Sequence, residues 1–189
     1  MDSYVKAIMY AYPYLEYMET EYAQHIENKA VLSYAGDQNV ERLAEYIAGQ
    51  VIEKEKIGKL KTLADRVWAT LNDVERTLAA VRYFGTEKKI KKAPKGVAAG
   101  VFRVDEIRQR LKTAFSNERN YFRRQQRLVK KLAATFRGFG LTEAAFLSEF
   151  GQIAFLKKVF ETVKAGKDAR LRLNEKRWLG GDWKGKSNK

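Results

Sequence analysis

Residues 117–136 read NERNYFRRQQRLVKKLAATF, and their pattern decides the fold class that the sequence predicts. At about 100° per residue, the apolar and the charged side chains of this stretch fall on opposite sides of one helix. The apolar side holds Phe122, Val129, Leu132, Ala133 and Phe136. The other side holds Asn120, Arg123, Arg124, Arg127, Lys130 and Lys131. We therefore expect an amphipathic helix that buries one face and presents a cationic one.

Two longer helices are predicted before this stretch. Residues 4–32 place Tyr10, Tyr14 and Tyr17 at spacings of four and three, and Pro13 is expected to kink this helix or to end its first turn. A turn that contains Gly36 follows, and a second apolar stripe continues to Trp68. We expect the two helices to form an antiparallel hairpin over residues 1–70 that serves as a protein-contact region.

Residues 71–137 are predicted to form a second domain. Asn72 and Glu75 stand at capping-box spacing at the start of a helix that Gly85 closes. Residues 86–103 combine lysines with glycine and proline and have no sustained period, which indicates a mobile basic loop. A short helix over residues 104–115 then precedes the basic helix, which Ser116 caps. The local order is helix, short turn, helix.

One further helix is predicted near the C-terminus. Glycines at 138 and 140 end the basic helix, and Thr142 is positioned to start an amphipathic helix that ends near Gly166. Its apolar members are Phe146, Phe150, Ile153, Phe155 or Leu156, and Phe160. We expect this C-terminal helix, within residues 138–173, to pack on the preceding domain, and residues 174–189 to form a tail that is at least partly disordered. The predicted fold class is all-α.

The positive charge of the chain is concentrated in its middle. Residues 86–137 hold 16 Lys and Arg against 4 Asp and Glu, whereas residues 1–85 hold 10 against 13 and residues 138–189 hold 11 against 6. Most of the net charge of +14 therefore belongs to one central block. A block this cationic most often binds a polyanion, and nucleic acid is the first candidate.

Composition argues against several other classes of function. The chain has no cysteine, which excludes disulfides and thiolate metal sites and is compatible with a reducing cytoplasm, the expected location. No stretch approaches the roughly 20 apolar residues of a membrane span. The single histidine, His25, stands four residues after Glu21, which is not a di-iron spacing. Because no nucleophile with a base and no phosphate-binding glycine motif is found, we expect no cofactor, no metal and no enzyme activity.

The cationic face and the basic loop provide candidate DNA contacts. A helix that enters a groove of duplex DNA neutralises phosphates, while residues near its N-terminal end reach base edges. Asn120 and Arg123 are the candidate base readers, with Arg124 as a third. The full predicted contact set is Arg119, Asn120, Arg123, Arg124, Arg127, Lys130 and Lys131 on the helix, and Lys88, Lys89, Lys91 and Lys92 on the loop.

Three of these features also have a plainer interpretation. The charged helix face could be a solvated surface, although such a face normally mixes both signs of charge. The basic loop could be a connector that charge keeps soluble. The tyrosines at 10, 12, 14, 17 and 22 could stack on unpaired bases, but their helical spacing within an acidic segment favours packing with a polar tip, or a patch that binds a protein partner.

Residues 71–84, LNDVERTLAAVRYF, resemble the opening helix of the promoter-reading region-four domain of bacterial sigma factors. VDEI at residues 104–107 and SNERNYFRRQQRLVKKL at residues 116–132 are similar to the helix-turn-helix of that domain. The second run is also similar to phage late-gene regulators of the ArpU type. The loop over residues 86–103 is longer than the connector of the family, and residues 1–70 show no promoter-melting domain.

The resemblance implies a sequence-specific, double-stranded-DNA-binding regulator of transcription or sigma-like protein, associated with a phage. It also implies RNA polymerase as a partner of the N-terminal hairpin, which is otherwise expected to form a homodimer. The alternative, from another class, is a phage DNA-packaging or structural assembly protein that oligomerises on DNA. A closed ring in solution would favour assembly, and a monomer or dimer would favour regulation.

Overall fold

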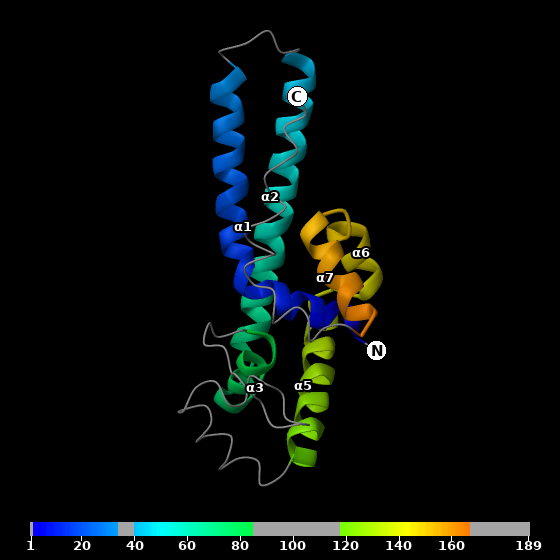
Figure 1. Cartoon of the computed structure of the whole chain (residues 1–189). Coiled ribbons are helices and arrows are strands. Elements are labelled where there is room, and N and C mark those ends of the chain that lie inside the picture. The colour runs from blue at the N-terminus through cyan, green and yellow to red at the C-terminus, as the bar shows by residue number, and fades with distance from the viewer. Residues whose placement is uncertain (1, 34–39, 85–117, 167–189) are drawn as a thin grey trace.

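The computed structural model describes residues 2–33, 40–84 and 118–166 of the 189-residue chain (Figure 1). Within these ranges all regular structure is helical, which confirms the predicted all-α class. The helices are α1 (Ser3–Ser33), α2 (Val40–Ala69), α3 (Asp73–Tyr83), α5 (Glu118–Gly138), α6 (Glu143–Phe150) and α7 (Ala154–Lys164). The predicted loop over residues 86–103, the predicted helix over residues 104–115 and the predicted tail over residues 174–189 lie outside the described residues.

The two longest helices, α1 and α2, form the antiparallel hairpin that the apolar stripes predicted (Figure 1). Their shared seam is apolar close to the rest of the molecule, where Leu15 and Met18 of α1 and Ile57 and Leu60 of α2 are buried. Burial of such side chains is worth about 1.5–3 kcal/mol each, so this part of the seam holds the hairpin together. None of the helices in the described ranges is long and apolar enough to cross a membrane.

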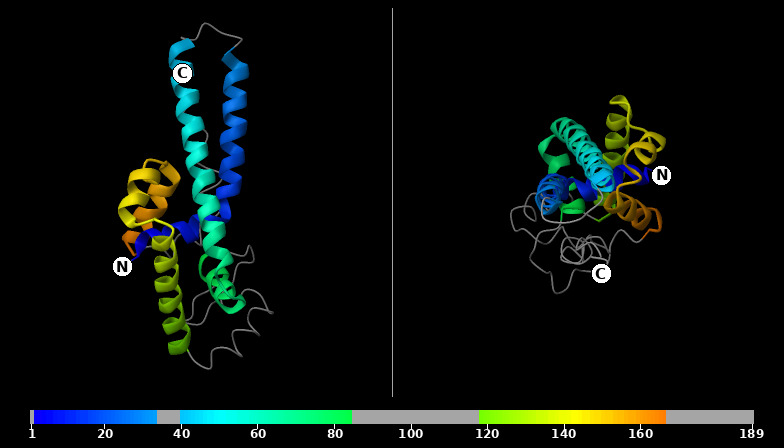
Figure 2. Two further views of the ribbon diagram at one scale, coloured as in Figure 1. Left: turned by 180° about the vertical axis from the view of Figure 1, so that it is seen from behind. Right: turned by 90° about the horizontal axis from the view of Figure 1, so that it is seen from above.

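Helix α1 bends, and its N-terminal part runs across the end of the hairpin toward α5, α6 and α7 (Figures 1 and 2). Pro13 lies inside the helix and accounts for the bend, because its ring lacks an N–H and crowds the carbonyl four residues earlier. The part before Pro13 is almost entirely core, with Val5, Ile8 and Ala11 fully enclosed.

The core of the protein is continuous across residue 70, where the sequence predicted a domain boundary. The Tyr4 hydroxyl donates a hydrogen bond to the Leu141 carbonyl oxygen at 3.2 Å, and its ring lies 6.3 Å from that of Phe146. Farther along α1, the Tyr14 ring meets the edge of Phe155 at 6.2 Å. The first turns of α1 therefore pack among the C-terminal helices.

The single C-terminal helix predicted from Thr142 to Gly166 is wrong, because the structure has two helices there. Thr142 caps α6 as predicted, accepting a bond from the Ala145 N–H at 3.2 Å. The first helix ends at Gly151, and Ile153 adopts an extended backbone before α7 begins. The break has a packing reason: it lets α7 bury Phe155, Leu156, Val159, Phe160 and Val163, which one straight helix continuous with α6 would not bring to the same core.

Candidate nucleic-acid interface

The basic helix α5 lies beside α3 and runs antiparallel to it (Figure 1). Near one end the Gln125 side-chain amide donates to the Leu78 carbonyl oxygen at 3.0 Å, and near the other Lys131 meets Glu75. The buried side of α5 consists of Gln125, Leu128, Leu132, Ala133 and Phe136. This agrees with the prediction for the last three.

Gln125 and Leu128 were missed as members of the buried face, and Val129, which was predicted there, is only half-buried. The spacing of Gln125, Leu128 and Leu132 at three and four would have marked them as one line of the helix. From the sequence alone, a glutamine in that line is predicted to face solvent, because its hydrogen-bond partner on α3 is not apparent there. The side chain of Phe122 is not among those the structure describes.

The outer side of α5 carries a stripe of cations. Arg123, Arg127 and Lys130 are exposed and are spaced by four and three residues, so they lie along one line that is opposite the buried Leu132. Arg124 is also exposed, beside this line. From residue 119 to residue 142 the sequence contains no acidic residue. We call Arg123, Arg127 and Lys130 the cationic stripe.

Four ion pairs between described residues lie away from the cationic stripe. They join Lys61 to Asp65, Arg76 to Asp73, Lys131 to Glu75 and Arg137 to Asp2. No described acidic side chain is paired with a member of the stripe, so its positive field is directed outward.

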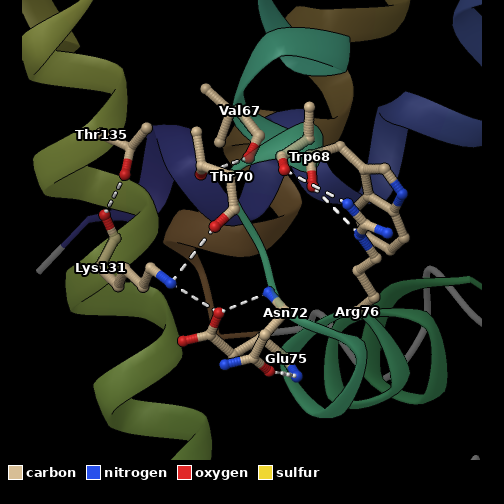
Figure 3. Close-up of polar contacts among 9 residues, drawn as sticks. Val67, Trp68, Thr70, Asn72, Glu75, Arg76, Lys131 and Thr135 are labelled. Carbon is tan, nitrogen blue, oxygen red and sulfur yellow. Dashed lines mark hydrogen bonds and ion pairs between the residues drawn. The ribbon is translucent and has the colours of Figure 1, made fainter.

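Lys131 has a different position from its neighbour Lys130. Its ammonium group lies 2.6 Å from Glu75 Oε2 and 3.5 Å from the Thr70 carbonyl oxygen (Figure 3). The sequence placed Lys131 among the phosphate contacts, but the structure turns it toward the start of α3, where it holds α3 against α5. Only the register of the two helices reveals this partner, which is 56 residues away in sequence.

Glu75 is also the reciprocal member of the predicted capping box, which the structure confirms. The Asn72 side chain accepts a bond from the Glu75 N–H at 2.9 Å, and the Glu75 carboxylate accepts one from the Asn72 N–H at 3.0 Å. Burial raises the pKa of Glu75, but the hydrogen bonds from Lys131 and from the Asn72 backbone, with the Lys131 charge, outweigh it and lower the pKa below its ordinary value. The carboxylate therefore stays ionised near neutral pH.

Arg76 joins the end of α2 to the start of α3. Its guanidinium donates to the carbonyl oxygens of Trp68 at 3.4 Å and Ala69 at 3.2 Å, which belong to the last turn of α2 (Figure 3). Carbonyls at a helix C-terminus have no partner within the helix, so these bonds satisfy groups that the hairpin would otherwise expose. Arg76, Glu75 and Lys131 together connect α2, α3 and α5 and fix the orientation of the cationic stripe.

Several predicted contacts cannot be placed. Arg119 and Asn120 belong to the first turn of α5, but their side chains lie outside what the structure describes. The loop lysines Lys88, Lys89, Lys91 and Lys92 also lie outside the described residues. The predicted readers of bases are thus represented in the described part by Arg123 and Arg124.

The N-terminal tyrosines are mainly packing residues, which was the favoured interpretation. Tyr10 and Tyr22 are buried, and the hydroxyls of Tyr12 and Tyr22 donate to Asp65 at 2.6 Å and Glu53 at 2.7 Å. Burial first, and then these carboxylate partners, raise the pKa of both tyrosines. The expected tyrosine-rich surface for a protein partner is not formed, because among the five only Tyr17 is exposed.

His25 contacts a tyrosine. Its Nε2 lies 2.7 Å from the Tyr46 hydroxyl, with the two rings edge to face. No group of three or more His, Asp or Glu side chains suited to a metal ion occurs in the described ranges. Comparisons of the chain with protein-family models, curated proteins and solved structures found no match.

Proposed function

We propose that α5 binds double-stranded DNA through its outer face. The observation that carries the proposal is the cationic stripe: Arg123, Arg127 and Lys130 are exposed, aligned and opposite the buried face. A helix about 10–12 Å across fits the major groove, which is about 12 Å wide. Exposed Arg and Lys on such a helix neutralise phosphates, and Arg can bind the major-groove edge of guanine with two hydrogen bonds.

The position of α5 supports the same proposal. Its N-terminal part extends away from α6 and α7 at the end of the molecule opposite the tip of the hairpin (Figure 1). Residues near the N-terminal end of a recognition helix reach bases, and Asn120, Arg123 and Arg124 belong to that part. Within the proposal these residues read bases, and Arg127 and Lys130 hold phosphates.

The test compares two variants that lose the same positive charge. In the first, Arg123, Arg127 and Lys130 become Gln. In the second, the exposed residues Lys59, Arg66 and Lys157, on α2 and α7, become Gln. Binding to a labelled duplex is followed by fluorescence anisotropy over a series of salt concentrations. Each lost phosphate contact lowers the slope of log affinity against log salt by about 0.9, and the proposal gives phosphate contacts to Arg127 and Lys130, so the stripe variant should lose about 1.8 from that slope.

The control variant should keep a slope close to that of the unchanged protein. Equal weakening in the two variants would reduce the effect to net charge and would reject α5 as the binding element. An unchanged slope in the stripe variant would reject it as well. Both variants change only exposed side chains, so their folding can be verified by an unchanged urea midpoint.

We propose further that the protein regulates transcription, as its resemblance to sigma region four and ArpU-type regulators implies. Selection of bound duplexes from a random pool tests this part. A recovered consensus, together with retention of RNA polymerase on the immobilised protein, would support regulation. Binding without a sequence preference would favour the DNA-packaging or assembly alternative.

A further inference from the structure

The hairpin continues well beyond the body of the protein, and its outer part lacks a core. We define the distal hairpin as residues 23–31 of α1 and residues 40–56 of α2, the part farthest from α3 and α5 (Figures 1 and 2). None of its residues is buried, whereas the part closer to the body buries Leu15, Met18, Tyr22, Ile57 and Leu60.

Polar pairs connect the two helices where the buried seam gives way to the distal hairpin. The Tyr22 hydroxyl donates to Glu53 at 2.7 Å, and His25 lies 2.7 Å from the Tyr46 hydroxyl. Such pairs fix the register but bury little apolar surface. Helices in water depend on an apolar face packed against a partner, so a two-helix extension without buried residues is a weak structure by itself.

The distal hairpin has an apolar stripe on each helix. On α2, Val40, Ala44, Ile47 and Val51 follow one another at spacings of four, three and four, the spacing of a coiled-coil seam. Val40, Ala44 and Val51 are exposed and Ile47 is half-buried. On α1, the half-buried residues Ala23, Ile26 and Ala30 follow the same rule.

The two stripes lie on the same side of the hairpin. Continued toward the body, the α1 stripe reaches Glu19, and the α2 stripe reaches Gly58, seven residues after Val51. These end points touch, because a Cβ on residue 58 would lie 3.2 Å from Glu19 Oε1. Both lines therefore start from one contact on one side of the hairpin, and together they form its apolar face.

The charge of the distal hairpin differs from that of the rest of the chain. Its two segments contain five acidic and four basic residues, whereas the whole chain carries +14. A nearly neutral surface does not attract nucleic acid, and it allows two copies to approach without strong repulsion. Its mixed charges flank the apolar face, as the polar rim of an interface does.

The area of the face sets the expected strength of the contact between two chains. At 1.5 Å per residue, residues 40–56 of α2 span about 25 Å and residues 23–31 of α1 span about 14 Å, so two helices of about 10 Å diameter make a face of roughly 400 Å² per chain. Two such faces would bury roughly 800 Å² in total, which is the size of a weak, reversible interface and not of a permanent one.

We propose that the apolar face of the distal hairpin binds the same face of a second copy of the chain, so that the two hairpins form a four-helix bundle. A two-fold axis places identical stripes against each other, and each a/d-spaced line then packs into the opposite hairpin. The buried seam near the body would thereby continue to the hairpin tip as the core of the bundle. The dimer requires no DNA and no residue of α5.

The experiment measures the mass of the full chain by analytical ultracentrifugation over a wide concentration range, without DNA. One variant carries Val40→Lys and Val51→Lys, at positions 76% and 38% exposed on the apolar face. The matched control carries Val31→Lys and Ile52→Lys, at positions 69% and 52% exposed. Val31 and Ile52 each directly follow a residue of the stripes, so at about 100° per residue they point to another side.

The unchanged chain and the control should approach twice the chain mass of 21.8 kDa as concentration rises, and the apolar-face variant should dissociate at least tenfold more readily. All four positions are exposed and both variants gain two positive charges, so folding and net charge are matched. A monomer at every concentration would overturn the proposal, and the apolar face would then have to bind something other than a second copy of the chain. Equal dissociation of both variants, or a dimer that survives in the apolar-face variant, would also overturn it.

Discussion

Replacing Lys131 with methionine should destabilise the protein by about 1 kcal/mol, whereas the same change at Lys130 should cost less than about 0.5 kcal/mol. Lys131 Nζ lies 2.6 Å from Glu75 Oε2, between side chains that are 41% and 22% exposed. An exposed ion pair contributes about 0–1 kcal/mol and a hydrogen bond to a charged group about 1.5–3 kcal/mol, so this half-buried pair falls between them. Glu75 keeps its bond from the Asn72 N–H, which limits the loss.

The assay is urea unfolding of the single variants and of a double variant with Glu75→Gln. Glutamine can still close the capping box, so Glu75→Gln removes the charge of the pair with little change to the cap. The double-mutant cycle formed by these variants should give a coupling energy of about 0.5–1 kcal/mol between Lys131 and Glu75. Thermal midpoints should fall by about 2–4 °C for each kcal/mol. A coupling energy of zero would refute the idea that this pair holds α3 against α5.

The same pair predicts how the loss depends on pH. The pKa of Glu75 in the folded protein lies below its ordinary value of 4.5, so the pair stabilises the fold above about pH 4.5, and this contribution disappears as pH falls through the folded pKa. The difference between the unchanged protein and Lys131→Met should therefore be complete at pH 7 and shrink below pH 4.5. A difference that stays constant or grows on acidification would contradict the assignment.

Two further predictions concern the core and the helices. Phe136→Ala should lower the free energy of unfolding in urea by about 3–5 kcal/mol, because Phe136 is fully buried. Phe139→Ala, at a position that is 45% exposed, should lower it far less. Similar losses of stability in the two variants would contradict the burial of Phe136 in the core. Gly49→Ala should stabilise the protein by about 0.5–1 kcal/mol, because Gly49 lies inside α2 and nothing occupies the space that an added Cβ would take. Gly151→Ala should destabilise the protein, because the added Cβ would collide with the Leu147 carbonyl oxygen. A gain in stability from both changes in urea unfolding would contradict this account.

Local rules were enough to predict most of the helices in the described part of the chain. The capping box of Asn72 and Glu75 and the N-cap at Thr142 depend on neighbours within three residues, and both are present. The long stripes of α1 and α2 predicted a hairpin because only pairing of two such faces buries them. The break between α6 and α7 escaped prediction. The break lets α7 bury its apolar residues in the core, and that core includes helices that are distant in sequence.

The candidate site was predictable in part for the same reason. The separation of charged and apolar residues along α5 is a property of one helix, and it located Arg123, Arg127 and Lys130 on the exposed side. The separate position of Lys131 depends on the register between α5 and α3, which no pattern within α5 contains. Pro13 was recognised as a possible kink, but the direction in which it sends the first turns of α1 depends on the core that receives them.

The proposed DNA-binding helix and the proposed dimer face lie toward opposite ends of the molecule, because the tip of the hairpin and the first turn of α5 point away from each other (Figure 1). The contacts of Arg76 with the last turn of α2 and of Lys131 with Glu75 connect the hairpin to α3 and α5. If two hairpins pair with their tips at the same end, both α5 helices lie at one end of the dimer and can reach half-sites of one duplex, about 34 Å apart or a multiple of that. If the hairpins pair in opposite directions, the α5 helices lie at opposite ends and the dimer bridges two duplexes. The polarity of the bundle would therefore decide between a regulator of one DNA site and a protein that assembles DNA.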